Sequence, residues 1–189
     1  MNLFEFLLVI VSIVLGLGIG ELLGGLVRIL RGDLAPGWLH SLWMLIVFQL
    51  QVQLAWGLWG LRAREQWLYP EFLLLLLAPM LLYLTAAVLF PAAASSENLD
   101  VHLLRRQRPF FLLIASYVVE TDLFGWLLLD EHWILGAQLL RVMAFVVLSV
   151  LAITRNRVLH FVLGFLILTS QLWFTYMFTF VVGAAPTTP

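Results

Sequence analysis

The stretch Leu3–Leu30, LFEFLLVIVSIVLGLGIGELLGGLVRIL, decides the fold of this 189-residue chain. An α-helix needs about 20 predominantly apolar residues to cross the ~30 Å hydrocarbon core of a bilayer, and this stretch meets that requirement. It carries Glu5, has no basic flank in front of it, and its apolar run is longer than that of a secretion signal. We therefore expect the segment to be a retained membrane span.

Similar apolar stretches follow along the rest of the chain, which is 63% hydrophobic and 11% charged with a mean hydropathy of +1.03. A soluble domain is about half apolar and about a quarter charged. The sequence therefore predicts an all-α, polytopic membrane bundle in one domain, with no room left for a soluble catalytic domain. The six expected transmembrane helices are residues 3–30, 38–61, 69–90, 109–129, 133–154 and 158–182.

The arginines predict the orientation of these spans. Seven of them fall in the first, third and fifth connections and two in the second: Arg28, Arg31, Arg105, Arg106, Arg108, Arg155 and Arg157, against Arg62 and Arg64. Cytoplasmic loops carry the excess of positive charge. The odd-numbered connections are therefore expected in the cytoplasm, and both termini on the periplasmic or extracellular side.

The longest connection, residues 92–108, is expected to be cytoplasmic and to hold a short interfacial helix. Ser95 or Ser96 is a candidate N-cap, and Leu99 and Leu103 lie four residues apart on one face.

The glycine-rich segment GLGIGELLGG, Gly16–Gly25, resembles a nucleotide-binding loop only superficially. The spacing from Gly18 is GxGxxxG, whereas the dinucleotide fingerprint is GxGxxG between a strand and a helix. A loop within hydrocarbon would also leave its backbone amides without partners. A nucleotide site is therefore not predicted.

Small residues recur at every fourth position of the same segment, at Ser12, Gly16, Gly20 and Gly24. They line one stripe of the helix and allow another helix to approach closely, as in a glycine zipper. Two alternatives remain: packing within the monomer, which we prefer because every helix of a bundle needs neighbours, and an oligomer interface.

Ionisable residues within spans are costly and mark functional sites by default. Glu21 lies beside the glycine stripe, on the face of Gly18 and Gly25, where it could meet water or Arg28. We expect Glu21 on the cytoplasmic approach to an ion pathway.

Two carboxylates and one arginine lie deeper in the chain, at Glu120, Asp122 and Arg141. Counted from the connection between their helices, Asp122 and Arg141 lie at nearly equal depth. An ion pair between them is the natural way to keep both charged, with Glu120 as an alternative partner.

Glutamines Gln49, Gln53 and Gln171 extend this polar belt. The belt is either a hydrated path for protons or small cations, or a set of interhelical hydrogen bonds that fix the packing. Because deep carboxylates outnumber deep bases, one of them is expected to hold a proton or a cation.

His40 and His160 lie near the ends of their spans and could bind haem b if their helices were neighbours. Interfacial hydrogen bonding is the alternative. The chain has no cysteine, no HExxH and no nucleophile-elbow motif. We predict no catalytic residues, no metal site and no cofactor, with haem as a weak alternative.

Two stretches, LFEFLLVIVSIVLGLGIGELL and FP…LDVHLLRRQRPFF, resemble a group of small bacterial inner-membrane proteins of unknown function. The resemblance implies a multi-pass protein of the bacterial inner membrane. It carries no functional residues over to this chain.

Three functions are consistent with these features. The first is a small channel or transporter for protons or small cations that uses the polar belt. The second is a non-catalytic structural or accessory subunit that assembles with copies of itself or with another membrane protein through the glycine stripe. The third is a haem- or quinone-binding redox protein. The expected partner in each case is the lipid bilayer, and the net charge of −1 does not favour a nucleic acid.

Overall fold

The computed structural model describes residues 3–62, 64, 66–92, 95–128 and 135–179, which are predominantly helical. The α-helices are α1 (Leu3–Leu30), α2 (Trp38–Gly57), α3 (Tyr69–Leu89), α4 (Leu99–Arg105), α5 (Gln107–Leu128), α6 (Leu135–Ile153) and α7 (Arg157–Phe174). A 3-10 turn, η1 (Leu58–Leu61), extends α2, and a π-helical segment, η2 (Thr175–Thr179), extends α7. Two short strands, β1 (Leu34–Ala35) and β2 (Ser95–Asn98), pair in parallel.

Five of the described helical stretches are long and apolar enough to cross a membrane: Phe4–Leu30, Trp38–Leu61, Tyr69–Leu89, Gln107–Leu127 and Arg157–Met177. The prediction of a mainly helical chain with several membrane-length helices is therefore confirmed, and the described chain adds one short pair of strands. The predicted span 133–154 contains α6, of which Arg141–Ile153 forms a shorter apolar helix. Residues 133–134, and the last residues of the predicted span 158–182, lie outside the described part of the chain.

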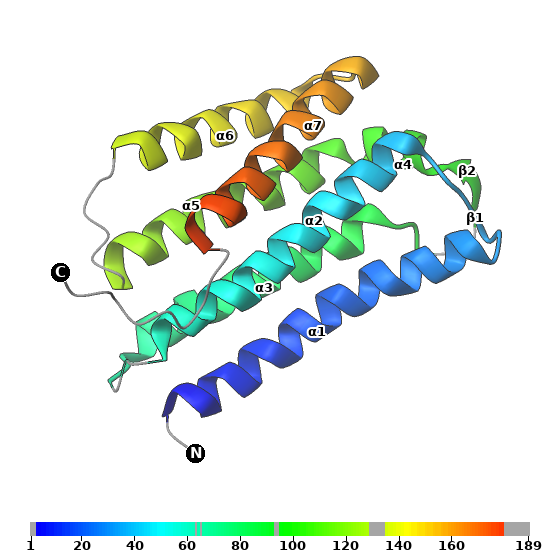
Figure 1. Ribbon diagram of the computed structural model, residues 1–189. Helices are drawn as coiled ribbons and strands as arrows, with labels where there is room; N and C mark the ends of the chain where they lie inside the picture. The colour runs from blue at the N-terminus through cyan, green and yellow to red at the C-terminus, as the bar shows by residue number, and fades with distance from the viewer. Residues whose placement is uncertain (1–2, 63, 65, 93–94, 129–134, 180–189) are drawn as a thin grey trace.

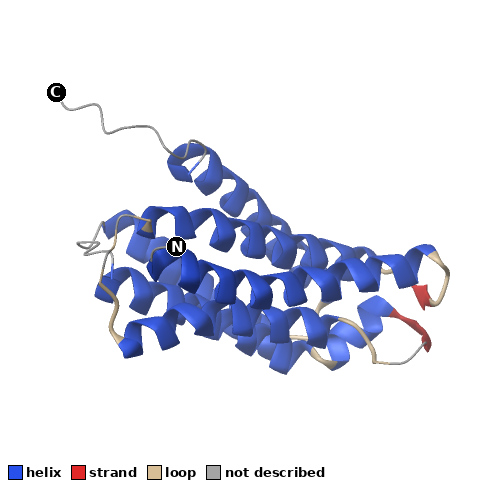
Figure 2. Cartoon of the chain, turned by 90° about the horizontal axis from the view of Figure 1, so that it is seen from below, coloured by secondary structure: helices blue, strands red, loops and turns tan. Residues whose placement is uncertain are grey.

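The helices form two layers. In the first, α1 packs against α3, α3 against α5, and α5 against α6; in the second, α2 contacts α1 and α3 on one side and α7 on the other. Figure 1 shows successive long helices running in alternating directions, and Figure 2 shows them aligned along one axis with both strands at one end.

The end of the bundle that carries β1 and β2 is held by side chains of the long connection. Asp100 Oδ1 accepts a hydrogen bond from the backbone amide of His40 at 2.9 Å, at the first turn of α2. Asn98 Nδ2 donates to the Pro36 carbonyl at 3.0 Å. A Cβ on Gly37 would overlap Asp100, so this contact requires glycine. The expected short helix is present as α4, but its N-cap is Asn98, which accepts from the Asp100 amide, and not Ser95 or Ser96.

The arginine-rich connections gather at this same end. The three odd-numbered connections follow α1, α3 and α6 there, while η1 and the start of α3 lie at the opposite end (Figure 1). Arg28 also ties α1 to the connection after α3, because its Nη1 donates to the Pro91 carbonyl at 2.8 Å.

The core beneath β1 and β2 is aromatic. Trp43 of α2 meets Phe110 and Phe111 of α5 edge to face, with ring centroids 5.8 and 4.7 Å apart, and all three side chains are fully buried. Each such pair stabilises by about 0.5–1.5 kcal/mol beyond the burial of its surface. This cluster anchors the start of α5 and so fixes where its later residues lie.

The faces of α1 are the reverse of what the glycine spacing predicts. Gly16, Gly20 and Gly24 are exposed, as is Ser12, and a Cβ added to any of the three glycines would meet no atom within 4 Å. The preferred interpretation, packing of this stripe within the monomer, is therefore wrong for the described residues.

The glycines that do pack are Gly18 and Gly25, which are buried. A Cβ on Gly18 would lie 2.9 Å from Gln51 Nε2 of α2, and one on Gly25 would overlap the ring of Phe90. These two glycines share a helix face with Glu21 and were expected to leave room there for water or a counter-charge. Gln51 and Phe90 fill that room instead. Long side chains from other elements, and not a matching stripe of small residues, set the close approach.

Candidate functional site

A partly open cavity of about 530 Å³ lies between the two layers, in the half of the bundle that carries η1, away from β1 and β2. Its walls come from α2, η1, α3, α5, α6 and α7. Four residues of the predicted polar belt line it: Gln53, Glu120, Arg141 and Gln171. The structure thus brings together, around one space, residues that are up to 118 positions apart in sequence.

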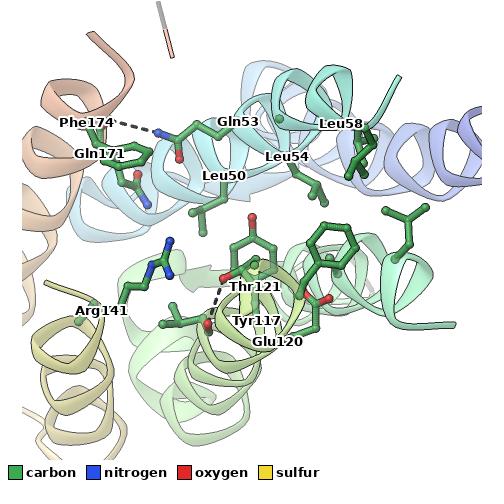
Figure 3. A pocket seen from close by; sticks show the side chains of 18 of the residues that line it. Leu50, Gln53, Leu54, Leu58, Tyr117, Glu120, Thr121, Arg141, Gln171 and Phe174 are labelled. Carbon is green, nitrogen blue, oxygen red and sulfur yellow. Dashed lines mark hydrogen bonds between the residues drawn. The ribbon is translucent and has the colours of Figure 1, made fainter. Parts of the chain in front are cut away.

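One face of α5 forms a large part of the wall. Tyr117, Glu120, Thr121 and Phe124 all line the cavity, and their spacing of three, four and seven residues places them on the same side of a helix. In Figure 3 the Tyr117 side chain directs its hydroxyl toward α2, in the direction of Leu50 and Leu54. Gly125 of α5 also lines the cavity.

Glu120 is the most unusual side chain of the site. It is only 4% exposed, and neither of its carboxyl oxygens has a hydrogen-bond partner among the described residues. At 1.5 Å per residue, Glu120 lies about 12 Å from the end of α5 at Leu128 and about 20 Å from its start at Gln107. It is therefore well inside a membrane-length helix.

Asp122 and Arg141 form the ion pair considered from the sequence. Arg141 Nη1 donates to Asp122 Oδ1 at 2.7 Å, and each side chain is about a third exposed (31% and 32%). Arg141 lines the cavity, whereas Asp122 does not. Figure 3 shows Arg141 and Glu120 on opposite sides of Tyr117. The arginine is thus neutralised by Asp122, and Glu120 is left outside the pair.

The glutamines of α2 join that helix to the end of α7. Gln53 Nε2 donates to Thr175 Oγ1 at 2.6 Å and to the Gln171 carbonyl at 3.1 Å, and Gln49 Nε2 lies 3.4 Å from Thr175 Oγ1. The contacts occur where α7 passes into η2. Gln49 and Gln53 therefore act as interhelical hydrogen-bond donors, which is the packing interpretation of the belt, and the Gln171 side chain faces the cavity with its Oε1 unpartnered among the described residues.

Glu21 is not part of this assembly. It is exposed on the outer side of α1, does not line the cavity, and has no hydrogen bond or ion pair within the described part of the chain. Gln51, two residues before Gln53 and on a different side of α2, is fully buried against Gly18, and neither its Nε2 nor its Oε1 has a partner among the described residues.

The two histidines near span ends are held by backbone carbonyls. His40 Nε2 lies 3.1 Å from the Leu89 carbonyl, and His160 Nε2 lies 2.6 Å from the Thr154 carbonyl; both rings are fully buried. These contacts are the hydrogen-bonding alternative to haem ligation. In the described ranges, no three His, Cys, Asp or Glu side chains are grouped so that they could hold a metal ion.

Tyr117, Phe124 and Gly125 are site residues that the sequence analysis missed. A signal was available, because Tyr117, Glu120 and Phe124 share the spacing of one helix face around a carboxylate. Comparison of the chain with protein-family models, with curated proteins and with solved structures finds no match. The function must therefore be argued from the cavity and the residues that surround it.

Proposed function

We propose that this protein is a small membrane transporter for protons or small cations, with Glu120 as the group that carries the proton or cation. One observation supports the proposal: Glu120 lines a cavity between membrane-length helices, its side chain is buried, and its carboxyl oxygens have no partner among the described residues. An ionised carboxylate without a partner is very costly in a medium of low dielectric. Glu120 is therefore stable there either with a proton or with a bound cation.

The surroundings of Glu120 support exchange rather than permanent pairing. The nearest arginine of the cavity wall, Arg141, already has Asp122 as its counter-charge at 2.7 Å. Tyr117, Thr121 and Gln171 line the same space, and each carries a polar group that could hydrogen-bond a proton or cation leaving Glu120, or its water. Ionisable residues that face a cavity within a membrane bundle commonly mark such paths.

The proposed setting is the bacterial inner membrane, crossed six times. In this arrangement α6 is the fifth span, the arginine-rich end with β1, β2 and α4 faces the cytoplasm, and both termini face the periplasm. The support is the concentration of arginines at one end of the bundle, as the positive-inside rule requires, together with the outward-facing apolar side chains of the long helices.

Reconstitution of the purified protein into liposomes tests the function. We expect a flux of protons or alkali cations, followed by an internal pH- or ion-sensitive dye, that Glu120→Gln abolishes. Glu21→Gln is the matched control, since it is the same substitution in another membrane-length helix but away from the cavity, and it should leave the flux unchanged. Tight liposomes that contain folded wild-type protein at verified density would refute the proposal.

A second candidate is a structural or accessory subunit, and the outward glycine stripe favours it. Gly16, Gly20 and Gly24 leave the outer face of α1 open to another helix, and small residues at this spacing promote helix association in membranes. Under this function Gly20→Leu disrupts an oligomer or a co-purifying partner, and Glu120→Gln has no flux to remove. Crosslinking of the wild type and Gly20→Leu in native membranes separates the two candidates.

A further inference from the structure

We infer that the cavity binds a small organic cation with an apolar or aromatic body, whose charged nitrogen lies at Glu120 in place of the proton. This inference rests on the proposed function, because it names the substrate of the same carboxyl group. It goes beyond that function because a path for protons or metal cations alone needs neither the volume nor the walls found here.

The size of the cavity is the first argument. A volume of about 530 Å³ lies within the ~300–1,000 Å³ range typical of pockets for small organic ligands. A bare proton or alkali ion would leave most of that space to be filled by water along leucine side chains. An organic body of moderate size would fill it with apolar contacts instead.

The chemistry of the walls is the second argument. Leucines from α2, η1 and α3 and the rings of Tyr117, Phe124 and Phe174 surround the cavity. Aromatic faces attract ammonium groups through cation–π interactions, which strengthen when the cation is removed from water. An apolar cation would therefore be stabilised both by burial of its body and by attraction of its charge.

The charge balance is the third argument, and it selects a cation over an anion or a zwitterion. Glu120 and Arg141 are the acidic and basic side chains of the described lining. Arg141 donates to Asp122 and so has its counter-charge, which leaves Glu120 as the uncompensated group. A ligand carboxylate would have to compete with Asp122 for Arg141. A ligand ammonium would pair with the Glu120 carboxyl group, whose two oxygens are buried and have no hydrogen-bond partner in the described chain.

Binding of the cation must displace the proton of Glu120. The neutral carboxyl group gives up its proton to solvent, and the carboxylate that remains pairs with the ammonium group. The positive charge of the ligand thus replaces that of the released proton, and the net charge of the site does not change. Over the pH range in which the ligand stays protonated, the apparent affinity should therefore rise with pH, by up to about tenfold per unit. The same competition would couple movement of the organic cation to movement of a proton.

Isothermal titration calorimetry on the purified full chain in detergent tests the inference, with 2-phenylethylamine as the probe. We expect saturable binding at one site, release of one proton per bound amine in buffers of different ionisation enthalpy, and a tighter complex at higher pH. Two probes of the same shape are the controls. 2-Phenylethanol lacks the positive charge and phenylalanine adds a carboxylate, and both should bind at least about tenfold more weakly.

Variants locate the site. Glu120→Gln should weaken amine binding at least tenfold and abolish proton release, Glu120→Asp should restore both in part, and Glu21→Gln should match the wild type. Equal binding of 2-phenylethanol, tighter binding of phenylalanine, or unchanged binding by Glu120→Gln would each overturn the inference. Proton flux in liposomes without any amine binding would overturn the inference alone, whereas amine binding without any flux would overturn the transport function and leave the binding site in place.

Discussion

Glu21 and Glu120 are the same residue type, each within a membrane-length helix, but the structure gives them opposite surroundings. Glu21 is exposed on the outer side of α1, near Gly20 and Gly24, where an added Cβ would meet no atom of the described chain within 4 Å. Glu120 is 4% exposed at the wall of a cavity, beside the ion pair of Asp122 and Arg141 and the ring of Tyr117. Hydropathy therefore locates both carboxylates within a span, but only their neighbours decide what each can do.

The same contrast holds for the glycines of α1. The face opposite the bundle carries the regular four-residue spacing, whereas the face toward the bundle carries Gly18 and Gly25, seven residues apart. Close packing in this protein depends on single glycines under long side chains of other elements. The regular stripe of small residues is the more conspicuous pattern in the sequence, but Gly18 and Gly25, which show no such regular spacing, make the close contacts inside the monomer.

The largest loss of stability is expected from a glycine substitution on the inner face of α1, compared with one on its outer face. Gly25→Leu places a side chain where the Phe90 ring lies, so we expect the variant to lose about 3 kcal/mol or to fail to fold. At Gly20 an added Cβ meets no atom of the described chain within 4 Å, so Gly20→Leu should lower the stability of the monomer by less than about 0.5 kcal/mol. Unfolding in detergent, followed by tryptophan fluorescence, measures both. Equal losses in the two variants would contradict the assignment of inner and outer faces.

Much of the helix layout follows from the sequence alone. Hydropathy and the Pro, Gly and Arg-rich connections place α1 at Leu3–Leu30 and α3 at Tyr69–Leu89 almost to the residue. The side of α1 that faces inward could not be predicted, because it depends on Gln51 and Phe90, which lie far along the chain. The parallel pairing of β1 with β2 also depends on contacts between distant connections.

The next largest change in stability is expected for Asp122, the paired carboxyl group of α5, compared with Glu120, the unpaired one. Asp122→Ala leaves Arg141 without its 2.7 Å partner, and removing one member of a buried pair costs about 3–5 kcal/mol. Because this pair is about a third exposed, we expect roughly 1–3 kcal/mol. Glu120→Gln removes no hydrogen bond to a described residue and should leave stability unchanged within about 0.5 kcal/mol.

A double-mutant cycle with Arg141→Ala sharpens this comparison. Asp122→Ala and Arg141→Ala together should cost less than the sum of the two single variants, since the pair is lost only once. Additive losses would mean that the two side chains do not interact in the folded protein.

Equal depth in a hairpin was enough to suggest the Asp122–Arg141 pair, because adjacent antiparallel helices bring such residues to one level. The cavity itself could not be predicted, since its walls combine α2, α3, α5, α6 and α7 and single-sequence reasoning does not give helix azimuths. Tyr117 and Phe124 were overlooked for a simpler reason: aromatic residues at helical spacing are most often ordinary core residues.

A smaller effect distinguishes two glutamines of α2 that face different neighbours. Gln53→Leu removes donors to Thr175 and Gln171, and interhelical hydrogen bonds in membranes contribute about 0.6 kcal/mol each. We therefore expect a loss of about 1 kcal/mol. Gln51 is buried without a described partner, so Gln51→Leu removes unsatisfied polar atoms and should raise stability by about 1 kcal/mol. If Gln51→Leu instead destabilised the protein, Gln51 would have a partner in the native membrane.

The smallest expected effect is on the pH dependence of stability. It comes from His102 on α4, away from both Glu21 and Glu120. Burial lowers the pKa of His102 from 6.5, and the Val88 carbonyl at 3.4 Å offsets this only in part. A histidine with a lowered pKa in the folded state binds fewer protons than in the unfolded chain, so stability falls as the pH drops below about 6.5. His102→Gln keeps a donor near Val88 but does not titrate, and its Tm should therefore decline less between pH 7.5 and 5.5 than that of the wild type. Under the proposed function, this variant should leave the pH dependence of flux unchanged, because the proposal places proton exchange at Glu120. If His102→Gln changed the pH profile of flux and Glu120→Gln did not, the site of proton exchange would lie at the arginine-rich end rather than in the cavity.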